Sequence, residues 1–419
     1  MFKGLKAFFS DPVLLKRYAA VIIGLAIFRL IASVPIPQID QSTISALLHQ
    51  NQILGAFNIF SGGGLSNFSI AMLGVFPYIT VSIVVQLLTV VSTKIHSLYH
   101  EEGEIGRKKI GQWTRIITVP VATVNAIGIL YYLQTQGAIT NLPIPDFALS
   151  VLFIVAGTVL TMWIGELITE FGVGNGISFI IFAGIVINIP TLITQMITTY
   201  SPALVVSYVL GAVGILIGCM VAVWMNEADR PIPITYARYG IGYGSGERRA
   251  KTYIPIKVNP VGVLSIIFAL TVMAFFQYGF KFLGGLEGWG VVQALGTHID
   301  VLLADGFYYA IPVALLTLFF TYFHAPIVFN TKKIAENLQN QGAFIPGVRP
   351  GEETEVYFKK VLKHILLYAA VFLVAVAALP YIITGSTTGT FIFAISGTGA
   401  LIIVHVILDV CRKTKERIS

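Results

Sequence analysis

Residues 57–91 read "FNIFSGGGLSNFSIAMLGVFPYITVSIVVQLLTVV" and join two opposed features. The first part holds three consecutive glycines, Gly62–Gly64, beside polar residues such as Ser61 and Asn67. Glycine is a poor helix former because it loses the most backbone entropy on ordering. The second part, residues 69–91, is an apolar run long enough for a helix to cross the hydrocarbon core of a bilayer. The stretch therefore predicts a weak, glycine-hinged segment followed directly by a membrane span.

The composition indicates many such spans. Of the 419 residues, 56% are hydrophobic and only 11% are charged, and the mean hydropathy is +0.81. Soluble domains carry about 25% charged residues, so a soluble fold of this composition would lack polar surface. The two cysteines, Cys219 and Cys411, both lie in apolar runs, which favours packing over a disulfide or a metal site. No cofactor and no metal is expected.

Ten apolar runs of about 20 residues predict ten membrane helices and an all-α polytopic membrane protein. Several runs contain Gly or Pro, which membrane helices tolerate where neighbouring helices cover the freed backbone groups. The runs lie at residues 13–34, 69–91, 112–133, 147–168, 177–198, 203–225, 258–281, 306–328, 362–383 and 388–411.

Basic residues gather in alternate connections between these predicted spans. They lie before span one, after spans two, six and eight, and after span ten. Of the 27 basic residues, only Arg29 and Lys281 fall outside these groups. Lys and Arg are retained on the cytoplasmic side of a membrane, so the pattern predicts that both termini are cytoplasmic. A missing or extra span would break this sorting, which supports the count of ten.

Two of the predicted cytoplasmic loops are long, at about residues 226–257 and 329–361, and both are rich in basic residues, Pro and Gly. Two interpretations of their arginines stay open. The residues could serve topology and solubility, or they could dock an acidic partner or an RNA phosphate backbone. The outer segment 35–68 is nearly uncharged and contains the glycine stretch.

Branched apolar residues recur on single helix faces in two of the predicted spans. Val75, Ile79 and Ile83 are spaced i, i+4, i+8, and Ile177 and Ile181 repeat the spacing. Core or lipid packing is the ordinary interpretation of such a face. A hydrophobic constriction that seals a pore by excluding water is the alternative.

The residues alone leave other functional classes open. A secondary transporter with inverted repeats needs charged or polar groups at mid-membrane. Here Glu166, Glu170 and Asp409 lie near predicted cytoplasmic ends of spans. His405 is more simply interpreted as a packed, hydrogen-bonded side chain than as part of a proton relay. A membrane-embedded enzyme or insertase without a pore is a third class, although no catalytic constellation is recognisable.

Several segments, in order along the chain, resemble the SecY family, the channel subunits of the bacterial protein translocase. Residues 57–91 resemble the family's plug and second span, and the loop after span eight is the most specific match. The matching segments are "FRLIASVPIP" (28–37), "EEGEIGRKKIGQWTR" (101–115), "WIGELITEFGVGNGISFIIFAGIV" (163–186), "IPIKVNPVGVL" (254–264) and "FNTKKIAENLQNQGAFIPGVRPGEET" (329–354).

The resemblance implies an hourglass channel built from two inverted-repeat halves, residues 1–198 with spans one to five and residues 199–419 with spans six to ten. It implies a pore ring of Val75, Ile79, Ile83, Ile177, Ile181, Ile267 and Ile402. It implies a plug half-helix at about residues 58–67, with Asn58, Phe60, Ser61, Gly62, Gly63, Gly64 and Leu65. It implies a lateral gate between spans two, three, seven and eight, where we expect the polar residues Thr80, Ser82, Gln86 and Asn125.

The resemblance also implies partners and a location. Arg349 matches a loop-tip arginine that the family uses with the motor ATPase SecA or the ribosome, and Arg248 and Arg249 match a basic pair in the other long loop. SecE- and SecG-type small subunits, unfolded secretory polypeptides, signal peptides, ribosomal RNA and membrane lipids are the other expected partners. The location is the bacterial plasma membrane, and no enzymatic activity is expected. The loop holding Arg248 and Arg249 is shorter than the family leads us to expect, which leaves open an accessory paralogue.

Overall fold

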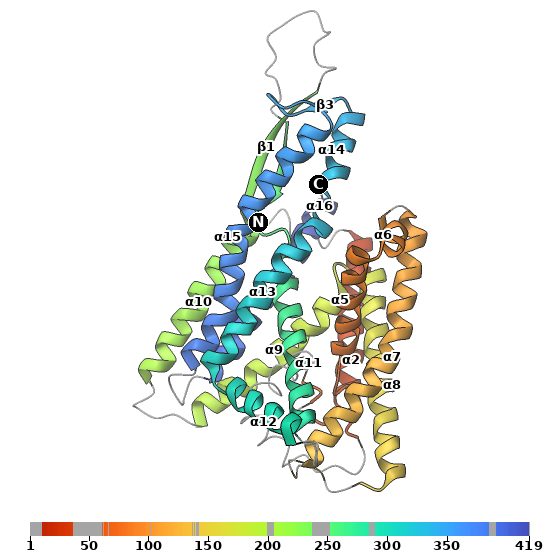
Figure 1. Ribbon diagram of the computed structural model, residues 1–419, viewed down its shortest axis with the longest axis vertical. Coiled ribbons are helices and arrows are strands. Elements are labelled where there is room, and N and C mark those ends of the chain that lie inside the picture. Colours follow the sequence, from red (N-terminus) through yellow and green to blue (C-terminus); the bar gives the residue numbers. More distant parts are fainter. Residues whose placement is uncertain are drawn as a thin grey trace, which may run out of the picture.

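The computed structural model describes residues 11–36, 61, 63–65, 67–100, 102–135, 137, 139, 142–198, 205–236, 252–284, 290–384 and 391–418. These residues form a tall bundle of helices that carries a small sheet at one end (Figure 1). The predicted plug residues Asn58, Phe60 and Gly62 and the predicted docking residues Arg248 and Arg249 lie outside the described residues.

A helix coincides with each of the ten predicted spans. These helices are α2 (Pro12–Ile31), α5 (Phe76–Val91), α7 (Gly103–Thr135), α8 (Ile144–Phe171), α9 (Gly176–Thr198), α10 (Val205–Glu227), α11 (Leu264–Gly284), α13 (Gly306–Val328), α15 (Glu352–Thr384) and α16 (Phe391–Ile418). Within the described residues, four helical stretches are long and apolar enough to cross a membrane by themselves, and five shorter apolar stretches accompany them.

Two helices begin later than the apolar pattern predicts. Helix α5 begins at Phe76 and not at residue 69, since residues 70–75 form turns and Pro77 fits only the first turn of a helix. Helix α11 begins at Leu264 and not at residue 258. There the Asn259 Oδ1 atom accepts the N–H of Gly262 at 3.0 Å and holds a turn before the helix.

One large apolar cluster runs through the bundle and draws on helices from both predicted halves. Helix α11 packs against α5 and α7, and α16 packs against α9 as well as α10. Large apolar side chains on the outer faces of the helices stay exposed, among them Leu152, Leu216 and Leu315. An exposed apolar surface of this extent fits a bilayer and not water.

A three-stranded antiparallel sheet stands at one end of the bundle and was not predicted from the sequence. Its strands are β1 (Asp229–Tyr236), β2 (Thr252–Lys257) and β3 (Ala343–Phe344), in the order β2–β1–β3. Strand β1 contains Pro231 and Pro233, and proline cannot donate to a ladder. The structure accommodates both because β3 pairs only with Thr235 and Tyr236, which leaves the proline stretch of β1 without a partner on that side.

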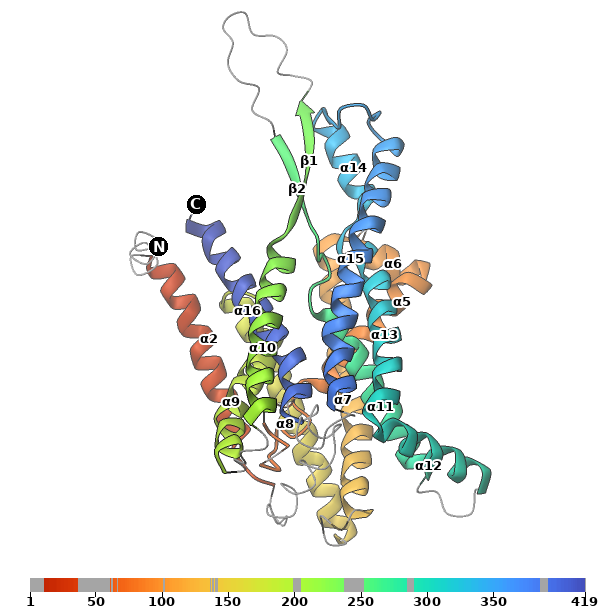
Figure 2. The ribbon, with the colours of Figure 1, turned by 90° about the vertical axis from the view of Figure 1, so that its left-hand side faces the viewer.

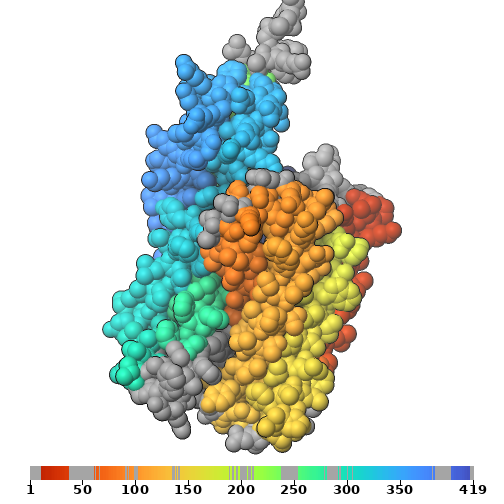
Figure 3. Space-filling view, turned by 45° about the vertical axis from the view of Figure 1, so that its right-hand side comes forward, coloured from red at the N-terminus to blue at the C-terminus, as the bar shows by residue number. Residues whose placement is uncertain are grey.

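The two loops predicted at 226–257 and 329–361 form one body and not two separate loops. Strands β1 and β2 come from the first loop, and β3 and α14 (Thr331–Asn340) come from the second. They share one apolar core with α15, formed by Ile232, Ile234, Ile256, Leu338, Ala343, Ile345, Phe358, Val361 and Ile365. We call this unit the sheet body. Figures 2 and 3 show it as a projection above the helix bundle.

Two further helices were not predicted. Helix α6 (Thr93–His100) lies between α5 and α7, and α12 (Gly290–Ala304) lies between α11 and α13. Both are too short to cross a bilayer, since about 20 residues are needed. A search for long apolar runs therefore passes over them.

The shared core predicts that one side chain of α15 stabilises both loops. Phe358 is fully buried and its ring lies 6.2 Å from that of Phe329. Replacing Phe358 with alanine leaves a cavity and is expected to cost about 3–5 kcal/mol. Limited proteolysis should then cut both loops, residues 226–257 and residues 329–361, much faster than in the unchanged protein. Val356→Ala, at an exposed position of the same helix, is the control. Faster cutting of only one loop would contradict the shared core.

Candidate functional site

The seven predicted ring residues come from four helices and meet in the large apolar cluster. Six of them are buried members of it and Ile177 packs against it. Helix α5 and the residue before it supply Val75, Ile79 and Ile83, α9 supplies Ile177 and Ile181, α11 supplies Ile267 and α16 supplies Ile402. Residues as far apart in the sequence as Val75 and Ile402 therefore belong to one apolar cluster.

The segment before α5 packs against the same cluster. Of the predicted plug residues, Ser61, Gly63, Gly64 and Leu65 are described, and all four are buried in turns and not in a regular helix. Gly63 has φ of +80°, a conformation that glycine adopts without strain. Leu65 belongs to the cluster that also holds Val75 and Ile79. The segment thus packs into the same large apolar cluster as the predicted ring residues.

Hydrogen bonds satisfy the backbone of this segment and tie it to the end of α2. The N–H of Ile36 donates to the carbonyl of Phe68 at 2.9 Å, and the N–H of Ile70 donates to the carbonyl of Val34 at 3.0 Å. The Ser69 hydroxyl donates to the carbonyl of Gly64 at 3.1 Å. Non-helical backbone inside a membrane protein persists only where such partners exist.

A glycine of α8 permits the closest approach to this segment. A Cβ atom at Gly157 would fall 2.1 Å from the carbonyl oxygen of Ile70. Gly64 is also confined, since a Cβ there would lie 2.6 Å from the carbonyl oxygen of Ala71. These two glycines are needed for close packing.

The four predicted gate residues lie on α5 and α7 and are all half-buried. The Thr80 hydroxyl donates to the carbonyl of Phe76, within its own helix. The Gln86 Nε2 atom donates to the Ser82 hydroxyl at 3.4 Å. The Gln86 Oε1 and Asn125 Nδ2 atoms are buried and have no hydrogen-bond partner among the described residues. An unpartnered buried polar group costs about 1–3 kcal/mol.

Helix α11 packs against α5 and α7 and carries a buried polar residue that was not predicted as part of the gate. Gln277 is buried, and its Oε1 atom also lacks a partner among the described residues. Figure 3 shows the surface of α11 and α13 adjoining that of α5 and α7. The rule that singled out Gln86 and Asn125, a polar residue inside an apolar span, would have found Gln277 as well.

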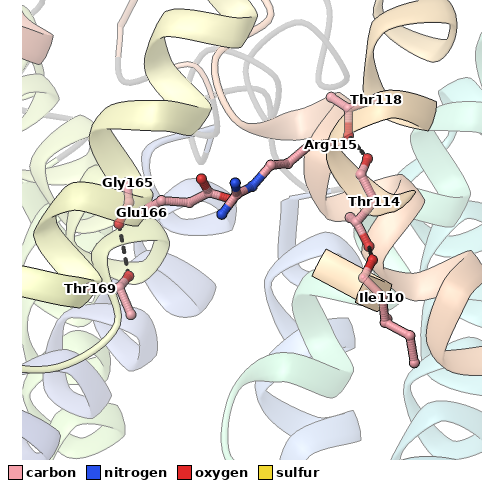
Figure 4. A network of polar contacts seen from close by, with 7 residues as sticks. All are labelled: Ile110, Thr114, Arg115, Thr118, Gly165, Glu166 and Thr169. Atoms are coloured by element: carbon pink, nitrogen blue, oxygen red, sulfur yellow. Dashed lines mark hydrogen bonds and ion pairs between the residues drawn. The ribbon is translucent and has the colours of Figure 1, made fainter. Parts of the chain in front are cut away.

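An ion pair joins α7 to α8 near the end of the bundle that carries the sheet body. The Arg115 Nε atom lies 2.7 Å from the Glu166 Oε1 atom, as Figure 4 shows. The nearby hydroxyls of Thr114, Thr118 and Thr169 donate to carbonyls in their own helices. Glu166 is therefore accounted for as a structural partner of Arg115.

A second polar junction ties α16 to the ends of α10 and α11. The Asn259 Nδ2 atom donates to the Asn226 Oδ1 atom at 3.2 Å, and the Arg412 guanidinium donates to the Asn226 carbonyl. The His405 ring packs against Gly262, where a Cβ atom would fall 2.6 Å from the His405 Cε1 atom. This packing favours the ordinary interpretation of His405 over that of a proton relay.

Exposed charges at the start of α7 pair along one helix turn. Lys108 lies 2.9 Å from Glu104, four residues away. The hydrogen bond and the charge of Lys108 lower the pKa of Glu104, and Glu104 raises the pKa of Lys108 in return. Both groups are exposed, so the pair contributes little to stability.

Arg349 is exposed in a turn of the sheet body and its backbone is fixed. The carbonyl of Arg349 accepts the hydroxyl of Thr354 at 2.8 Å, and its N–H donates to the Glu353 carboxylate at 3.3 Å. Gly347 and Gly351 on either side have φ of +85° and +101°, which glycine allows without strain. The turn therefore presents the Arg349 side chain on a rigid base.

No group of three or more His, Cys, Asp or Glu side chains that could hold a metal ion occurs among the residues that the structure describes. Neither free cysteine belongs to a cluster of this kind in that part of the chain. The described residues of the candidate site are a large buried apolar cluster and three buried polar atoms without a partner among the described residues, on Gln86, Asn125 and Gln277.

Comparison with known proteins gives one consistent result. The model of the SecY family matches residues 69–411. The protein translocase subunit SecY of Aquifex aeolicus (strain VF5) is 34% identical over 427 residues, which cover 98% of this chain and 95% of the relative. The protein translocase subunit SecY of Escherichia coli (strain K12) is 38% identical over 405 residues, which cover 94% and 90%.

Solved structures agree on the fold. A structure of a protein conducting channel superposes with a TM-score of 0.67 at 18% identity, covering 96% of this chain and 92% of the other. Sec61 in the canine ribosome–channel complex from the endoplasmic reticulum superposes with a TM-score of 0.60 at 16% identity, with the same coverage. The channel fold expected from the sequence is thereby confirmed.

The contact at Gly157 yields a test of how tightly the segment before α5 is held. Gly157→Ala forces the backbone at Ile70 to shift, and overpacking of this kind costs about 1–3 kcal/mol. The apparent melting temperature in detergent should fall. Gly128→Ala, in α7, is the matched control, since no atom lies within 4 Å of a Cβ there. It should leave the melting temperature unchanged or raise it, because alanine is the better helix former. Equal melting temperatures for the two variants would refute the close contact.

Proposed function

The chain belongs to the SecY family, and from that premise we propose how it works as a protein-conducting channel. Unfolded secretory polypeptides cross the plasma membrane through the middle of the helix bundle. Apolar segments of membrane proteins leave sideways through a lateral gate. The observation that carries this proposal is the meeting of seven branched apolar residues from four helices in one buried cluster.

The ring of these residues seals the channel against ions. A narrow passage lined by valine and isoleucine excludes water by dewetting, and an ion cannot enter without its hydration shell. The ring offers no hydrogen-bonding side chains, so it does not hold a passing polypeptide of any particular sequence. It lies where helices from both predicted halves meet, so a small separation of the helices widens it.

The segment around Ser61–Leu65 acts as the plug. It is buried against the cluster that contains the ring, and its conformation consists of turns. The segment lacks the cooperative hydrogen-bond ladder of a helix, but its buried contacts and its hydrogen bonds to residues 34–36 must break before it can leave, so its displacement needs the energy of an entering polypeptide or a bound partner. Glycine at positions 62–64 keeps the helix propensity of this segment low.

The lateral gate lies between α5 and α7 on one side and α11 and α13 on the other. Gln86, Asn125 and Gln277 hold buried polar atoms without partners among the described residues. These atoms lower the cost of opening, because separation of the helices exposes them to water in the channel or to a polar backbone. Signal peptides are the segments expected to enter this seam.

Energy comes from a partner, since the sequence shows no nucleotide-binding motif. The sheet body, with Arg349 on its rigid turn and Arg248 and Arg249 in the other loop, docks the motor ATPase SecA or the ribosome. Arginine suits both, because its guanidinium forms paired hydrogen bonds with carboxylates and phosphates. SecE- and SecG-type small membrane subunits complete the assembly.

The chain is a multi-pass protein of the bacterial plasma membrane. Both termini and the sheet body are cytoplasmic, as the distribution of basic residues indicates. Two inverted-repeat halves, residues 1–198 and 199–419, move relative to each other during gating. A secondary transporter is disfavoured, since family membership and the apolar ring leave no mid-membrane substrate site to support it.

Weakening the ring should make the channel leak. We expect the triple variant Ile79→Gly, Ile177→Gly and Ile402→Gly to conduct small ions at rest in planar bilayers. The matched control places glycine at exposed apolar positions of the same three helices, Val84, Ile189 and Ile407. Glycine costs up to about 1 kcal/mol of helix stability at each position of either set, and the ring set also loses buried packing, so both variants are first shown to insert and assemble at normal levels. A triple variant without resting ion conductance, or a control variant that conducts as much, would contradict the assignment of the ring.

Charge reversal at Arg349 should separate docking from folding. Arg349→Glu is expected to weaken binding of the purified motor ATPase by about tenfold or more, since a hydrogen bond to a charged group contributes about 1.5–3 kcal/mol. Membrane insertion of the protein should be unchanged. Lys332→Glu makes the same charge change at another exposed position of the sheet body and should have a smaller effect. Normal motor binding by Arg349→Glu would refute the docking role.

A further inference from the structure

Helix α12 lies at the end of the bundle opposite to the sheet body. In Figure 2 it projects sideways from the foot of α11 and α13. Its 15 residues, Gly290–Ala304, give a length of about 22 Å, which is shorter than the hydrocarbon core of about 30 Å. The helix packs against both α11 and α13. It therefore does not cross the membrane and lies beside its outer end.

The apolar face of α12 is wider than the surface that covers it. At 100° per residue, most apolar positions fall on an arc of about 220° that runs from Val301 to Gly296 and is interrupted by His298. Gly296 and Leu303 lie on the part that the protein buries, and Ile299 is half-buried. The part of the arc from Val301 to Leu295 is exposed, with relative exposures of 73% for Val301, 77% for Val291, 57% for Leu295 and 49% for Leu302. Val291, Leu295 and Leu302 fall within about 40° of one another and form a stripe, which we call the α12 stripe.

The two helices that α12 joins also carry exposed large side chains. These lie at Phe275 and Phe276 of α11 and at Phe307, Tyr308 and Ile311 of α13. Aromatic residues are enriched where a membrane protein meets the interface between lipid and water. Thr297 lies at least 120° from each residue of the stripe, whereas the exposed His298 lies at the edge of the stripe beside Val291.

The charge of the helix points to the kind of surface it meets. Residues 290–306 contain no Lys or Arg, and their charged residues are Asp300 and Asp305. Helices that bind anionic lipid carry basic residues on the polar face. Insertion of apolar side chains, without attraction to anionic headgroups, is the mode that this sequence allows.

We propose that α12 is an interfacial helix that inserts Val291, Leu295 and Leu302 into the boundary between headgroups and acyl chains of the bilayer. Assignment to the outer leaflet rests on the proposed topology. Since α12 joins α11 to α13, this contact anchors the outer ends of both helices to the membrane surface. A change in the lipid at that surface then acts on two helices of the proposed gate.

Fluorescence quenching tests the contact in the full-length chain. Leu295→Cys, in a background with Cys219→Ala and Cys411→Ala, is labelled with an environment-sensitive fluorophore and reconstituted in phosphatidylcholine vesicles. A nitroxide near the headgroup of a lipid should quench this label several-fold more than it quenches a label at Thr297→Cys. A nitroxide deep in the acyl chain should quench it less. Adding phosphatidylglycerol should not change the result, and Leu302→Cys should repeat it.

Three outcomes would overturn the proposal. If aqueous iodide quenches the label at Leu295→Cys as strongly as the label at Thr297→Cys, the stripe lies in water. Protection from both iodide and lipid nitroxide would assign it to a protein partner, such as a second copy of the chain. Stronger quenching by the deep nitroxide would place the helix inside the hydrocarbon core. The nitroxide lipids are present in both leaflets, so the label is quenched whichever side of the membrane α12 lies on. A wrong topology therefore would not be mistaken for absence of the lipid contact.

Discussion

The structure depends on one constraint: backbone N–H and carbonyl groups outside regular helices need hydrogen-bond partners inside a bundle of membrane helices. Residues 63–65 and 67–75 form turns and one bridge at Ser69 within an apolar cluster, where an unpaired N–H or carbonyl group has no water to replace its partner. The exchange of hydrogen bonds between this segment and residues 34–36 meets that need. The glycines at 64 and 157 let the backbones approach closely enough for it. The position of Val75, and with it the face of α5 that carries Ile79 and Ile83, follows from how this segment is held.

Helix α15 links the sheet body to the membrane part. Its first half contributes Phe358, Val361 and Ile365 to the core of the sheet body, and its second half contributes Leu373 and Ala377 to the large apolar cluster. Between them, Leu362 and Leu366 pack with Val261 and Ala325. A continuous helix that is packed along its length transmits force better than a loop. A partner that moves the sheet body would therefore act directly on α13, against which α15 packs.

The polar groups of the bundle divide into two kinds. At the ends of the helices, Arg115 pairs with Glu166, and Arg412 donates to the carbonyl of Asn226, so these groups fix helices together. Along α5, α7 and α11, Gln86, Asn125 and Gln277 keep buried atoms without partners among the described residues. The Asn226 Nδ2 and His324 Nδ1 atoms are also buried without partners among the described residues, so unpartnered atoms alone do not distinguish the proposed gate from the rest of the bundle.

The sequence by itself determined the ten helices of the membrane bundle, because span length is a local property. The sorting of Lys and Arg predicts the sidedness of their connections. Spacing placed Val75, Ile79 and Ile83 on one helix face, but the assignment of all seven residues to a pore ring rested on resemblance and stays a prediction. Tertiary structure alone decided that the two long loops share the core around Phe358 and that α12 leaves an apolar stripe uncovered. Each of these depends on which surfaces meet across distant parts of the chain, and no local pattern of residues records that.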